Sequence, residues 1–384
     1  MLKRLRFILT VIALLAAVGI SAQVTTATMS GKVTAQDEPI IGATIVAIHE
    51  PSGTRYGTVT NVSGQFTLQG MRTGGPYKVE ISYVGYQTAI YKGINLLLGE
   101  NYVLNVSLKE SSELLDEVVV TASKDSNMKS DRAGAVTNLT SAKIASIPTV
   151  SRSMNDIMRL SPQSNTTSNG FAAGGGNYRQ SFVTVDGASF NNAFGIGSNL
   201  PAGGAPISLD ALEQLSVSIT PYDVRQSGFT GAAINAVTKS GTNELTGSAY
   251  TFLTNNNLIG DRVGDNSIEL EKSHQYTYGA TLGGALIKNK LFFFVNGEYE
   301  NDLTAGPIAR ARNDESEKYG VNGIHRPVAS KMDEIRDYLI NKYDYDPGAY
   351  QGYNVTVPSY KFLARLDWNI NENNKVNVRF SKTN

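Results

Sequence analysis

Cysteine is absent from this chain of 384 residues, and histidine occurs only three times. The chain therefore forms no disulfide and uses no thiolate chemistry. The histidines, His49, His274 and His325, are scattered and form no ligand set, so we predict no metal site. Because no nucleophile–base pair is visible either, we predict no catalytic residue, no cofactor and no enzymatic activity.

A surplus of positive charge is also absent. Lysine and arginine together number 34, as do aspartate and glutamate, which gives a formal net charge of +0. Without a basic surface, the composition does not favour nucleic acid as a partner. The length predicts about two or three domains, at roughly 100–200 residues per domain.

The first residues have the pattern of a secretory signal peptide. Lys3, Arg4 and Arg6 precede an apolar run at residues 7–20, and small residues follow. This predicts a signal peptide at residues 1–22, whose loss leaves the mature chain slightly acidic. The alternative is an uncleaved anchor, but a spanning helix needs about 20 apolar residues. No cysteine follows the expected cut, so a lipid anchor is not expected.

Residues 23–110 are predicted to form one small β-sandwich. Apolar and polar residues alternate in four short runs, and turn residues separate them. Short strands with evenly spaced turns are typical of sandwiches. The alternating runs are residues 28–33, 43–48, 64–68 and 77–83. No acid pair, nucleophile or metal cluster is visible there, so we interpret the domain as a binding or spacer module.

The sandwich also resembles the carboxypeptidase-regulatory-like (transthyretin-like) family. The resemblance rests on four pieces of sequence, which are Gly31-Lys32-Val33, Pro39–Thr44, Thr60–Phe66 and Val84-Gly85-Tyr86. It implies the same two-sheet fold and points to no particular ligand.

Residues 111–127 contain a short β-prone segment between polar flanks. Two acids lead into three valines, a threonine and an alanine, which favours extended backbone. An isolated strand needs a partner edge, because its backbone groups are unpaired and it buries little. We predict that this strand is kept unpaired so that another protein can pair with it by strand addition. The alternative is an ordinary strand between domains. The segment that we predict to pair with the other protein consists of Asp116, Glu117, Val118, Val119, Val120, Thr121 and Ala122.

Residues 128–243 are predicted to form a mixed α and β domain. Helices are predicted within residues 140–162, where Ser141 and Ser153 can cap, and again at Ser208–Leu215. The second helix places Met154, Ile157, Met158 and Leu160 on its apolar side, and the third places Asp210 and Glu213 on its exposed side.

A glycine-rich stretch at residues 170–179 precedes a strand at residues 181–185, which ends in the turn Asp186-Gly187. A phosphate-binding loop would open a helix and be followed by a Lys-Ser or Lys-Thr pair. This stretch precedes a strand and lacks the pair. We therefore predict a flexible loop beside a strand.

The last third of the chain alternates apolar and polar residues with a period of two. The apolar side is rich in aromatic residues, which matches the lipid-facing side of a membrane barrel. The alternative is a soluble antiparallel sheet with one wet face. The predicted outward residues are Tyr276, Tyr278, Ala280, Leu282, Gly284, Leu286, Leu291, Phe293, Val295, Tyr299, Tyr360, Phe362, Ala364, Leu366, Trp368, Val376, Val378 and Phe380. A strand with less regular alternation is predicted at residues 245–253.

Connection lengths favour the membrane barrel. Tight turns at residues 288–290 and 371–374 alternate with long connections at residues 255–273 and 302–358. Membrane barrels combine short periplasmic turns with long outer loops in this way.

The longer connection is predicted to contain a helix at residues 330–343. Asp344 and Asp346 follow it, but their spacing fits no EF-hand calcium loop, so we predict a solvated turn. The strands number about five, whereas a closed membrane barrel needs at least about eight. We therefore expect the N-terminal part of a longer receptor, either a fragmentary record or a truncated gene.

Several motifs resemble the TonB-dependent outer-membrane receptors. Leu115–Ala122 resembles their TonB box, Val183–Gly187 their V-D-G plug strand, and Ile234–Gly241 the end of their plug. Tyr222–Gly231 resembles the Oar-like branch, which carries the same N-terminal sandwich. One departure is Ser216-Val217, where many receptors have an acid followed by valine. The resemblance marks the plug residues Arg179, Asp186, Gly187, Glu213, Arg225, Lys239 and Gly241.

This resemblance implies energy-coupled uptake of a glycan, peptide or metal chelate across the outer membrane of a Gram-negative bacterium. A TonB-type periplasmic energy-coupling protein would pair with residues 116–122, pull on them and rearrange the plug. The barrel would contact outer-membrane lipid, and the sandwich would lie in the periplasm. The alternatives are a surface adhesin or carbohydrate-binding protein anchored by a barrel, and an exported enzyme such as a peptidase.

The predicted fold class is therefore mostly β. We expect a signal peptide (residues 1–22), the sandwich (23–110), a TonB-box linker (111–127), an α+β plug (128–243) and the first strands of a truncated transmembrane β-barrel (244–384).

Overall fold

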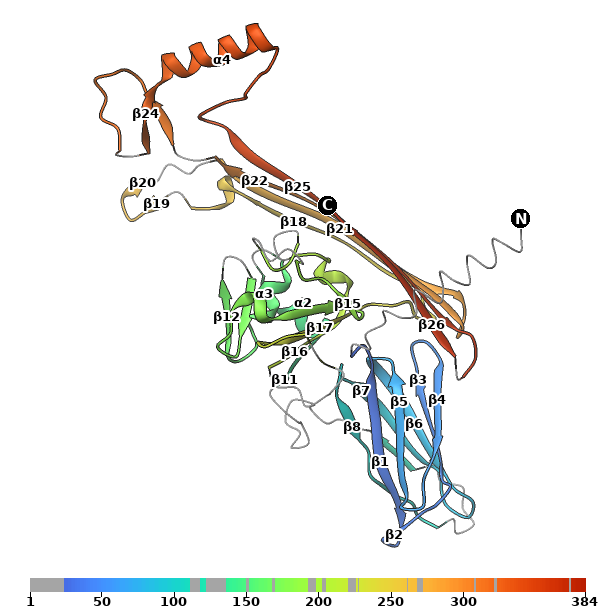
Figure 1. Cartoon of the computed structure of the whole chain (residues 1–384). Coiled ribbons are helices and arrows are strands. Elements are labelled where there is room, and N and C mark those ends of the chain that lie inside the picture. The colour runs from blue at the N-terminus through green and yellow to red at the C-terminus, as the bar shows by residue number, and fades with distance from the viewer. Residues whose placement is uncertain are drawn as a thin grey trace, which may run out of the picture. The chain divides into compact units, whose positions relative to one another are not determined.

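The computed structural model contains a sandwich, a plug and a sheet of long strands (Figure 1). The residues it describes are 24–110, 118–121, 136–149, 152–167, 170–192, 198–201, 205–219, 226, 228–260, 262–267, 272–306, 309–320, 323–372 and 374–384. The predicted signal peptide lies outside them.

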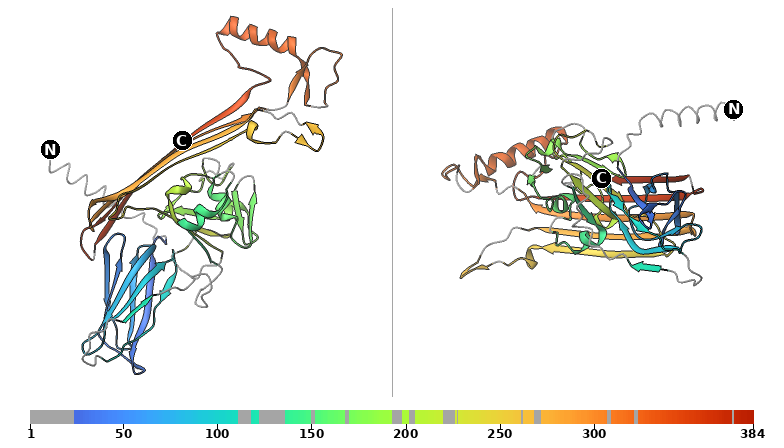
Figure 2. Two further views of the ribbon diagram at one scale, coloured as in Figure 1. Left: turned by 180° about the vertical axis from the view of Figure 1, so that it is seen from behind. Right: turned by 90° about the horizontal axis from the view of Figure 1, so that it is seen from below.

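Two five-stranded sheets form the sandwich (Figures 1 and 2). One sheet contains β1 (Ala27–Ala35), β2 (Glu38–Pro39), β5 (Gln65–Met71), β8 (Asn101–Val103) and β9 (Val106–Ser107). The other has the order β10-β7-β6-β3-β4, formed by Val118–Thr121, Ala89–Leu96, Gly74–Ser82, Thr44–His49 and Thr54–Val59. Alternate residues of both sheets, including Met29, Ile45, Tyr77 and Ile81, are fully buried in a shared core. The predicted sandwich is therefore confirmed.

The segment that we expected to be unpaired is paired in the structure. Strand β10 lies parallel to β7, with Val118 opposite Ala89 and Thr121 opposite Lys92. The segment is extended, as its β-branched residues favour, but the open edge of β7 supplies its partner. The prediction of an unpaired strand was wrong, because it overlooked an edge in the same chain. Residues 111–117 and 122–135 lie outside the described part of the chain.

The plug is built on a five-stranded sheet of order β11-β16-β17-β14-β15. These strands are Val136–Thr140, Leu212–Ser218, Ala233–Thr238, Phe182–Val185 and Ala188–Ser189. Helices α2 (Ser141–Ser146) and α3 (Met154–Met158), the hairpin of β12 (Ser164–Thr167) and β13 (Gly170–Ala173), and a 3₁₀ turn at Tyr178–Gln180 complete the domain. Their apolar residues form one core with the central strands.

The prediction of a helix at Ser208–Leu215 was wrong. The structure has a short 3₁₀ turn at Leu209–Ala211, followed by strand β16. Strand β16 pairs with β11 on one edge and β17 on the other, and these long-range hydrogen bonds outweigh the local helix preference. Glu213 is consequently half-buried on a strand and not exposed on a helix.

Three smaller expectations also changed. Thr140, and not Ser141, caps α2, whereas Ser153 caps α3 as predicted. Leu160 is 45% exposed and does not join the apolar side of α3, because the helix ends at Met158. The flexible glycine-rich loop begins as the buried strand β13, which pairs with β12.

The long strands form one sheet of order β18-β21-β22-β25-β26 (Figures 1 and 2). They are Thr246–Asn255, His274–Ile287, Leu291–Ala305, Asn354–Asn369 and Lys375–Thr383. The predicted alternation is confirmed: the predicted outward residues Phe362, Leu366, Trp368, Val376, Val378 and Phe380 are exposed, while Arg365, Asp367 and Arg379 lie on the other side. The short connections predicted between these strands are also present: β21 ends at Ile287 and β22 begins at Leu291, while β25 ends at Asn369 and β26 begins at Lys375.

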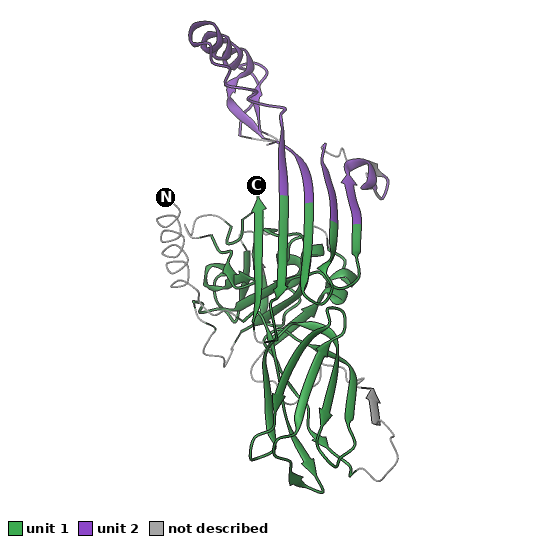
Figure 3. Cartoon of the chain, turned by 90° about the vertical axis from the view of Figure 1, so that its right-hand side faces the viewer, with its two compact units in different colours: residues 1–248, 281–297, 361–383 green, residues 249–280, 298–360, 384 purple. Residues whose placement is uncertain are grey.

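The chain divides into two compact units (Figure 3). Unit 1 holds residues 1–248, 281–297 and 361–383, and unit 2 holds residues 249–280, 298–360 and 384. Unit 2 contains the connecting elements β19 (Arg262–Val263), β20 (Asn266–Ser267), β23 (Arg310–Arg312), β24 (Ile324–Val328), α4 (Ala329–Tyr343) and a 3₁₀ turn at Asn256–Leu258. Of the helices in the described residues, none has the length and apolar character needed to cross a membrane.

Helix α4 is the helix predicted at residues 330–343. Asp344 ends it in a left-handed conformation at φ 51°, and Asp346 pairs with Arg336 at 3.3 Å. The two acids therefore have structural roles at the end of the helix. Among the described residues, no group of three or more metal-ligating side chains occurs.

Candidate functional site at the junction of sandwich, plug and long strands

The turn between β14 and β15 carries the predicted plug residues Asp186 and Gly187. Both have positive φ, 47° and 83°, and the glycine adopts this conformation without steric cost. The turn holds the Asp186 carboxylate against β17, where it accepts hydrogen bonds from the Thr238 amide (2.9 Å) and hydroxyl (2.7 Å). The remaining capacity of the carboxylate is used by two arginines of the long strands.

Arg365 on β25 is the first of these arginines. Its Nη1 lies 3.4 Å from Asp186 Oδ1 and donates to the Thr238 carbonyl at 2.7 Å. Its Nη2 pairs with Asp367 Oδ1 at 2.8 Å on the same strand. One guanidinium thus joins a plug turn to a neighbouring acid of its own strand.

Arg379 on β26 is the second arginine. Its Nη1 donates to the Val185 carbonyl at 2.7 Å and to Asp186 Oδ2 at 3.1 Å, and its guanidinium lies over the Phe190 ring. Two adjacent strands therefore bind the plug, through backbone carbonyls and through the Asp186 carboxylate.

Arg72 extends the network into the sandwich. It follows β5, and its Nη2 lies 3.7 Å from Asp367 Oδ2 and donates to the Gly241 carbonyl at 3.4 Å. Its guanidinium centre is 5.9 Å from the centroid of the Phe292 ring. Burial, partly opposed by the Asp367 charge, lowers the pKa of Arg72, but arginine stays protonated in proteins.

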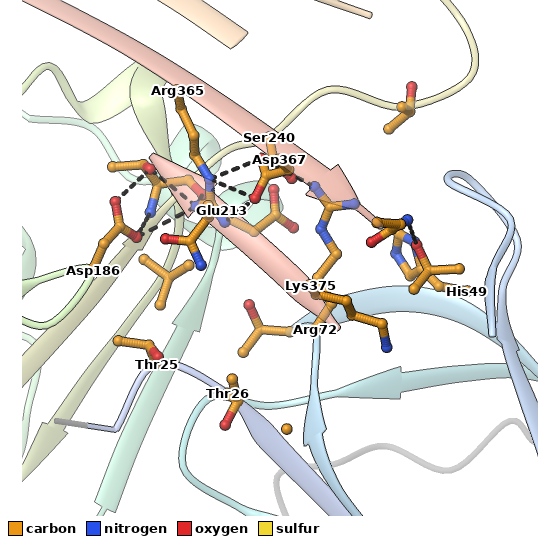
Figure 4. A pocket seen from close by; sticks show the side chains of 18 of the residues that line it. Thr25, Thr26, His49, Arg72, Asp186, Glu213, Ser240, Arg365, Asp367 and Lys375 are labelled. Carbon is orange, nitrogen blue, oxygen red and sulfur yellow. Dashed lines mark hydrogen bonds and ion pairs between the residues drawn. The ribbon is translucent and has the colours of Figure 1, made fainter. Parts of the chain in front are cut away.

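These side chains form a row of alternating charges, which we call the ionic row. Its members, in order, are Arg379, Asp186, Arg365, Asp367 and Arg72. Figure 4 shows the last four of them. All of them are 11–17% exposed, so water screens the charges little. Removing one partner from such a buried pair leaves an uncompensated charge and costs about 3–5 kcal/mol.

Glu213 on β16 lies beside the ionic row. Burial raises the pKa of its carboxyl, while the charges of Lys239, Arg72 and Arg365 oppose that rise. A carboxylate near these cations balances the excess positive charge of the row.

A buried serine–histidine pair lies in the sandwich part of the site. Ser52 Oγ is 2.7 Å from both His49 Nδ1 and Thr54 Oγ1. Burial, and secondarily the Arg72 charge, lowers the pKa of His49 to about 3, so the ring is neutral at pH 7. Ser52 has no exposed surface, and no substrate can reach its hydroxyl. The arrangement stabilises the turn and does not provide a nucleophile.

Two polar side chains of the plug form hydrogen bonds with the sandwich. Gln214 on β16 donates from Nε2 to the Leu96 carbonyl (3.0 Å) and accepts from the Leu98 amide (2.8 Å). Asn138 on β11 donates to Glu100 at 2.6 Å. Gln214 is 2% exposed, so these hydrogen bonds are formed away from water.

The last residue of β25 and the first residue of β26 also contact the sandwich. Asn369 Nδ2 donates to Thr54 Oγ1 at 3.0 Å, and Lys375 Nζ lies 3.3 Å from the centroid of the Tyr56 ring. A cation at that position is attracted by the negative face of the ring. The sandwich is therefore joined to the plug and to the long strands.

A cavity of about 290 Å³ lies among these groups. Side chains of both charge signs line it, and Figure 4 shows Thr25, Thr26, His49, Arg72, Asp186, Glu213, Ser240, Arg365, Asp367 and Lys375 around it. Balanced charge and many hydroxyl groups suit water and a rearrangeable contact more than one particular ion.

The remaining predicted residues are dispersed. Arg179 is exposed and stacks on Tyr178, away from the ionic row. Arg225 lies outside the described residues, as do Asp116, Glu117 and Ala122.

Lys239 and Gly241 follow β17 and lie at the site. A Cβ on Gly241 would come within 2.4 Å of the carbonyl oxygens of Gly284 and Phe293, so only glycine lets the plug end approach the long strands. The charge of Lys239 acts on Glu213.

Sequence reasoning did not assign the partners of Asp186. Arg365 and Asp367 alternate with the predicted outward residues Ala364, Leu366 and Trp368, which was the available signal. Nothing in the local sequence indicated that Arg72, far away in the chain, would meet them.

Two family models match parts of the chain. The carboxypeptidase regulatory-like domain matches residues 28–109, and the outer membrane beta barrel domain matches residues 237–310. With the fold described above, they define a class: an outer-membrane β-strand protein that carries a carboxypeptidase regulatory-like sandwich.

Similarity to a curated protein defines this class more closely. The TonB-dependent transporter Oar of Myxococcus xanthus is 25% identical over 244 residues, which are 60% of this chain and 21% of that protein. The chain thus spans 21% of the length of that curated relative. Together with the domain matches, this similarity supports a relationship to the TonB-dependent receptors of the outer membrane.

Solved structures give lower similarity. The siderophore receptor PirA of Acinetobacter baumannii is 19% identical over 65% of this chain and 31% of its own, with a TM-score of 0.43. The ferric enterobactin receptor PfeA of Pseudomonas aeruginosa, solved with enterobactin, is 16% identical over 66% and 33%, also with a TM-score of 0.43. Scores of this size do not by themselves establish a shared fold.

Proposed function

We propose that the chain works in energy-coupled movement of a substrate across the outer membrane. The substrate, a glycan, peptide or metal chelate, binds on the long connections and the plug. The sandwich lies in the periplasm, where a TonB-type protein pairs with residues 116–122 and pulls. The pull rearranges the plug, and no covalent chemistry is needed.

The observation that carries this proposal is the ionic row. The plug turn at Asp186 contacts the long strands through hydrogen bonds and ion pairs, involving Arg365 and Arg379. A polar contact can open and let water in, because water solvates the separated charges. A large apolar contact would instead expose surface that resists solvation. Beside it, Phe294 and Leu363 of the long strands join the apolar core of the plug, so the polar part of the contact is the part that suits a plug that separates and returns.

Partner binding tests the proposal directly. The full chain in detergent is titrated with the periplasmic domain of the TonB-type protein from the same bacterium. Val119→Pro removes one backbone donor from the segment, and we expect it to abolish binding. Val119→Ile, which keeps the donor and the β-branched shape, serves as the matched control and should bind like the natural chain.

The opposite result would be informative. If Val119→Pro binds as well as Val119→Ile, strand addition at this segment is excluded. A natural chain that binds no TonB-type protein at all would instead favour a passive surface protein anchored by the long strands.

A further inference from the structure

Strand β10 lies at the edge of a sheet and has a second edge of its own. The sheet order is β10-β7-β6-β3-β4, so β10 is a terminal strand whose inner edge pairs with β7. Within the described ranges of the chain, no strand pairs with its outer edge. That edge carries the backbone donors and acceptors that a further strand would need.

Pairing with β7 also fixes the backbone of β10 in an extended conformation. The strand has 4 residues, and a strand of this length is not stable alone. On β7 its register is set, with Val119 opposite Ile90 and Val120 opposite Tyr91. Because the extended conformation is already fixed, an incoming strand does not have to order it.

Strand β7, which pairs with β10, is itself held by contacts with β6 and with the plug. The other edge of β7 pairs with β6, with Tyr91 opposite Val79 and Ala89 opposite Ile81. At the far end of β7, the Leu96 carbonyl accepts the hydrogen bond from Gln214 of the plug. The strand that holds β10 is therefore also the strand that the plug holds.

Building on the proposed function, we infer that the energy-coupling partner docks on a composite edge made by β10 on β7. An extended strand of the partner pairs with the outer edge of β10 while β10 stays on the sandwich. The sandwich is thus part of the docking surface, and the partner strand continues its sheet. The rival arrangement, in which the partner first removes β10 from β7, is an outcome of the test below.

A single engineered disulfide separates the two arrangements. Thr121 and Lys92 are opposite each other, Lys92 is exposed, and the chain has no cysteine of its own. Neighbouring strands lie about 4.7–4.9 Å apart, within the roughly 4.4–6.8 Å that a disulfide spans between Cα atoms. The test variant is Thr121→Cys with Lys92→Cys. The control is Thr121→Cys with Val59→Cys, since Val59 lies on β4 at the opposite edge of the sheet.

The readout is the affinity of the full chain, oxidised and reduced, for the periplasmic domain of the TonB-type protein. We expect the test variant to form the disulfide and the control not to. The oxidised form should bind at least as tightly as the reduced form, to within about twofold, because β10 is already in place.

Three results would overturn the inference. A loss of about tenfold or more on oxidation would show that β10 must leave β7 before the partner binds. Failure of the test variant to form a disulfide would show that β10 does not rest there. If neither the reduced form nor the natural chain binds, the proposed function fails together with the inference, whereas loss in the oxidised form alone overturns the inference only.

Discussion

The sandwich and the sheet of long strands share one sequence pattern and use it in opposite ways. In the sandwich, alternate apolar residues such as Ile45 and Ile81 are fully buried between two sheets. In β25 and β26, apolar residues such as Trp368 and Phe380 are 50% and 59% exposed, while Arg365 and Arg379 point to the plug. The pattern determines which residues share a face, and the solvent around the sheet determines which face is inside.

The largest effect is expected where the polar side of the long strands meets the plug. Asp186→Asn keeps the shape of the side chain but removes the only ion pair described for Arg379 and one of the two ion pairs of Arg365. We expect a loss of about 3–5 kcal/mol in the free energy of unfolding, measured by urea titration of the full chain in detergent. Asp337, an exposed residue of helix α4, serves as the control. Asp337→Asn should change the free energy of unfolding by less than about 0.5 kcal/mol. Equal effects would show that the ionic row does not hold the plug.

The next effect concerns the apolar side of the sandwich. Tyr77 is fully buried, and its hydroxyl donates to the Arg72 carbonyl at 2.7 Å. Tyr77→Ala should cost about 3 kcal/mol through the cavity it leaves, measured by pulse proteolysis of the sandwich within the full chain. Tyr83→Ala, at a residue 37% exposed, should cost less than half as much. A similar cost for both would mean that the core is not packed around Tyr77.

A matched pair of valines tests the role of the solvent. Val378 on β26 and Val59 on β4 are 61% and 60% exposed. Val378→Arg should destabilise the chain in phospholipid vesicles by about 2–4 kcal/mol near the bilayer midplane, which is the cost expected for a charge on a lipid-facing strand. Val59→Arg should change stability by less than about 0.5 kcal/mol, because its face contacts water. If both are tolerated equally in vesicles, the outer face of β26 does not meet lipid.

The smallest effect concerns pH. Because burial raises the pKa of Glu213 above its usual 4.5, the folded chain holds this proton more tightly than the unfolded chain. Stability should therefore fall as pH rises from 4.5 through the raised value. Glu213→Gln removes this component, so the stability difference between variant and natural chain should change with pH in that window. A difference that stays constant with pH would place Glu213 in water.

Much of the fold was predictable because it depends on neighbouring residues. Turn residues and alternating runs predicted the sandwich, the long strands and the tight turns between them. Ser153 was predicted to cap α3 because a cap acts within a single turn of helix. The turn at Asp186-Gly187 was predicted for the same local reason.

The parts that could not be predicted depend on residues far apart in the chain. A helix was predicted at Ser208–Leu215, but β11 and β17 supply two strand edges to Leu212–Ser218 that no local pattern reveals. The ionic row joins Arg72 to Asp367, and Gln214 joins the plug to β7. The site is therefore a product of how the domains meet.

The sequence by itself determined the mostly β character of the chain, the two faces of each long strand and the extended backbone of residues 118–121. These follow from side-chain period and from β-branched residues, which act within a few positions. Only the tertiary structure decided that Asp186 faces two arginines and that β10 rests on β7. Hydrogen bonds and ion pairs need partners at about 3 Å, and only folding brings such distant residues together.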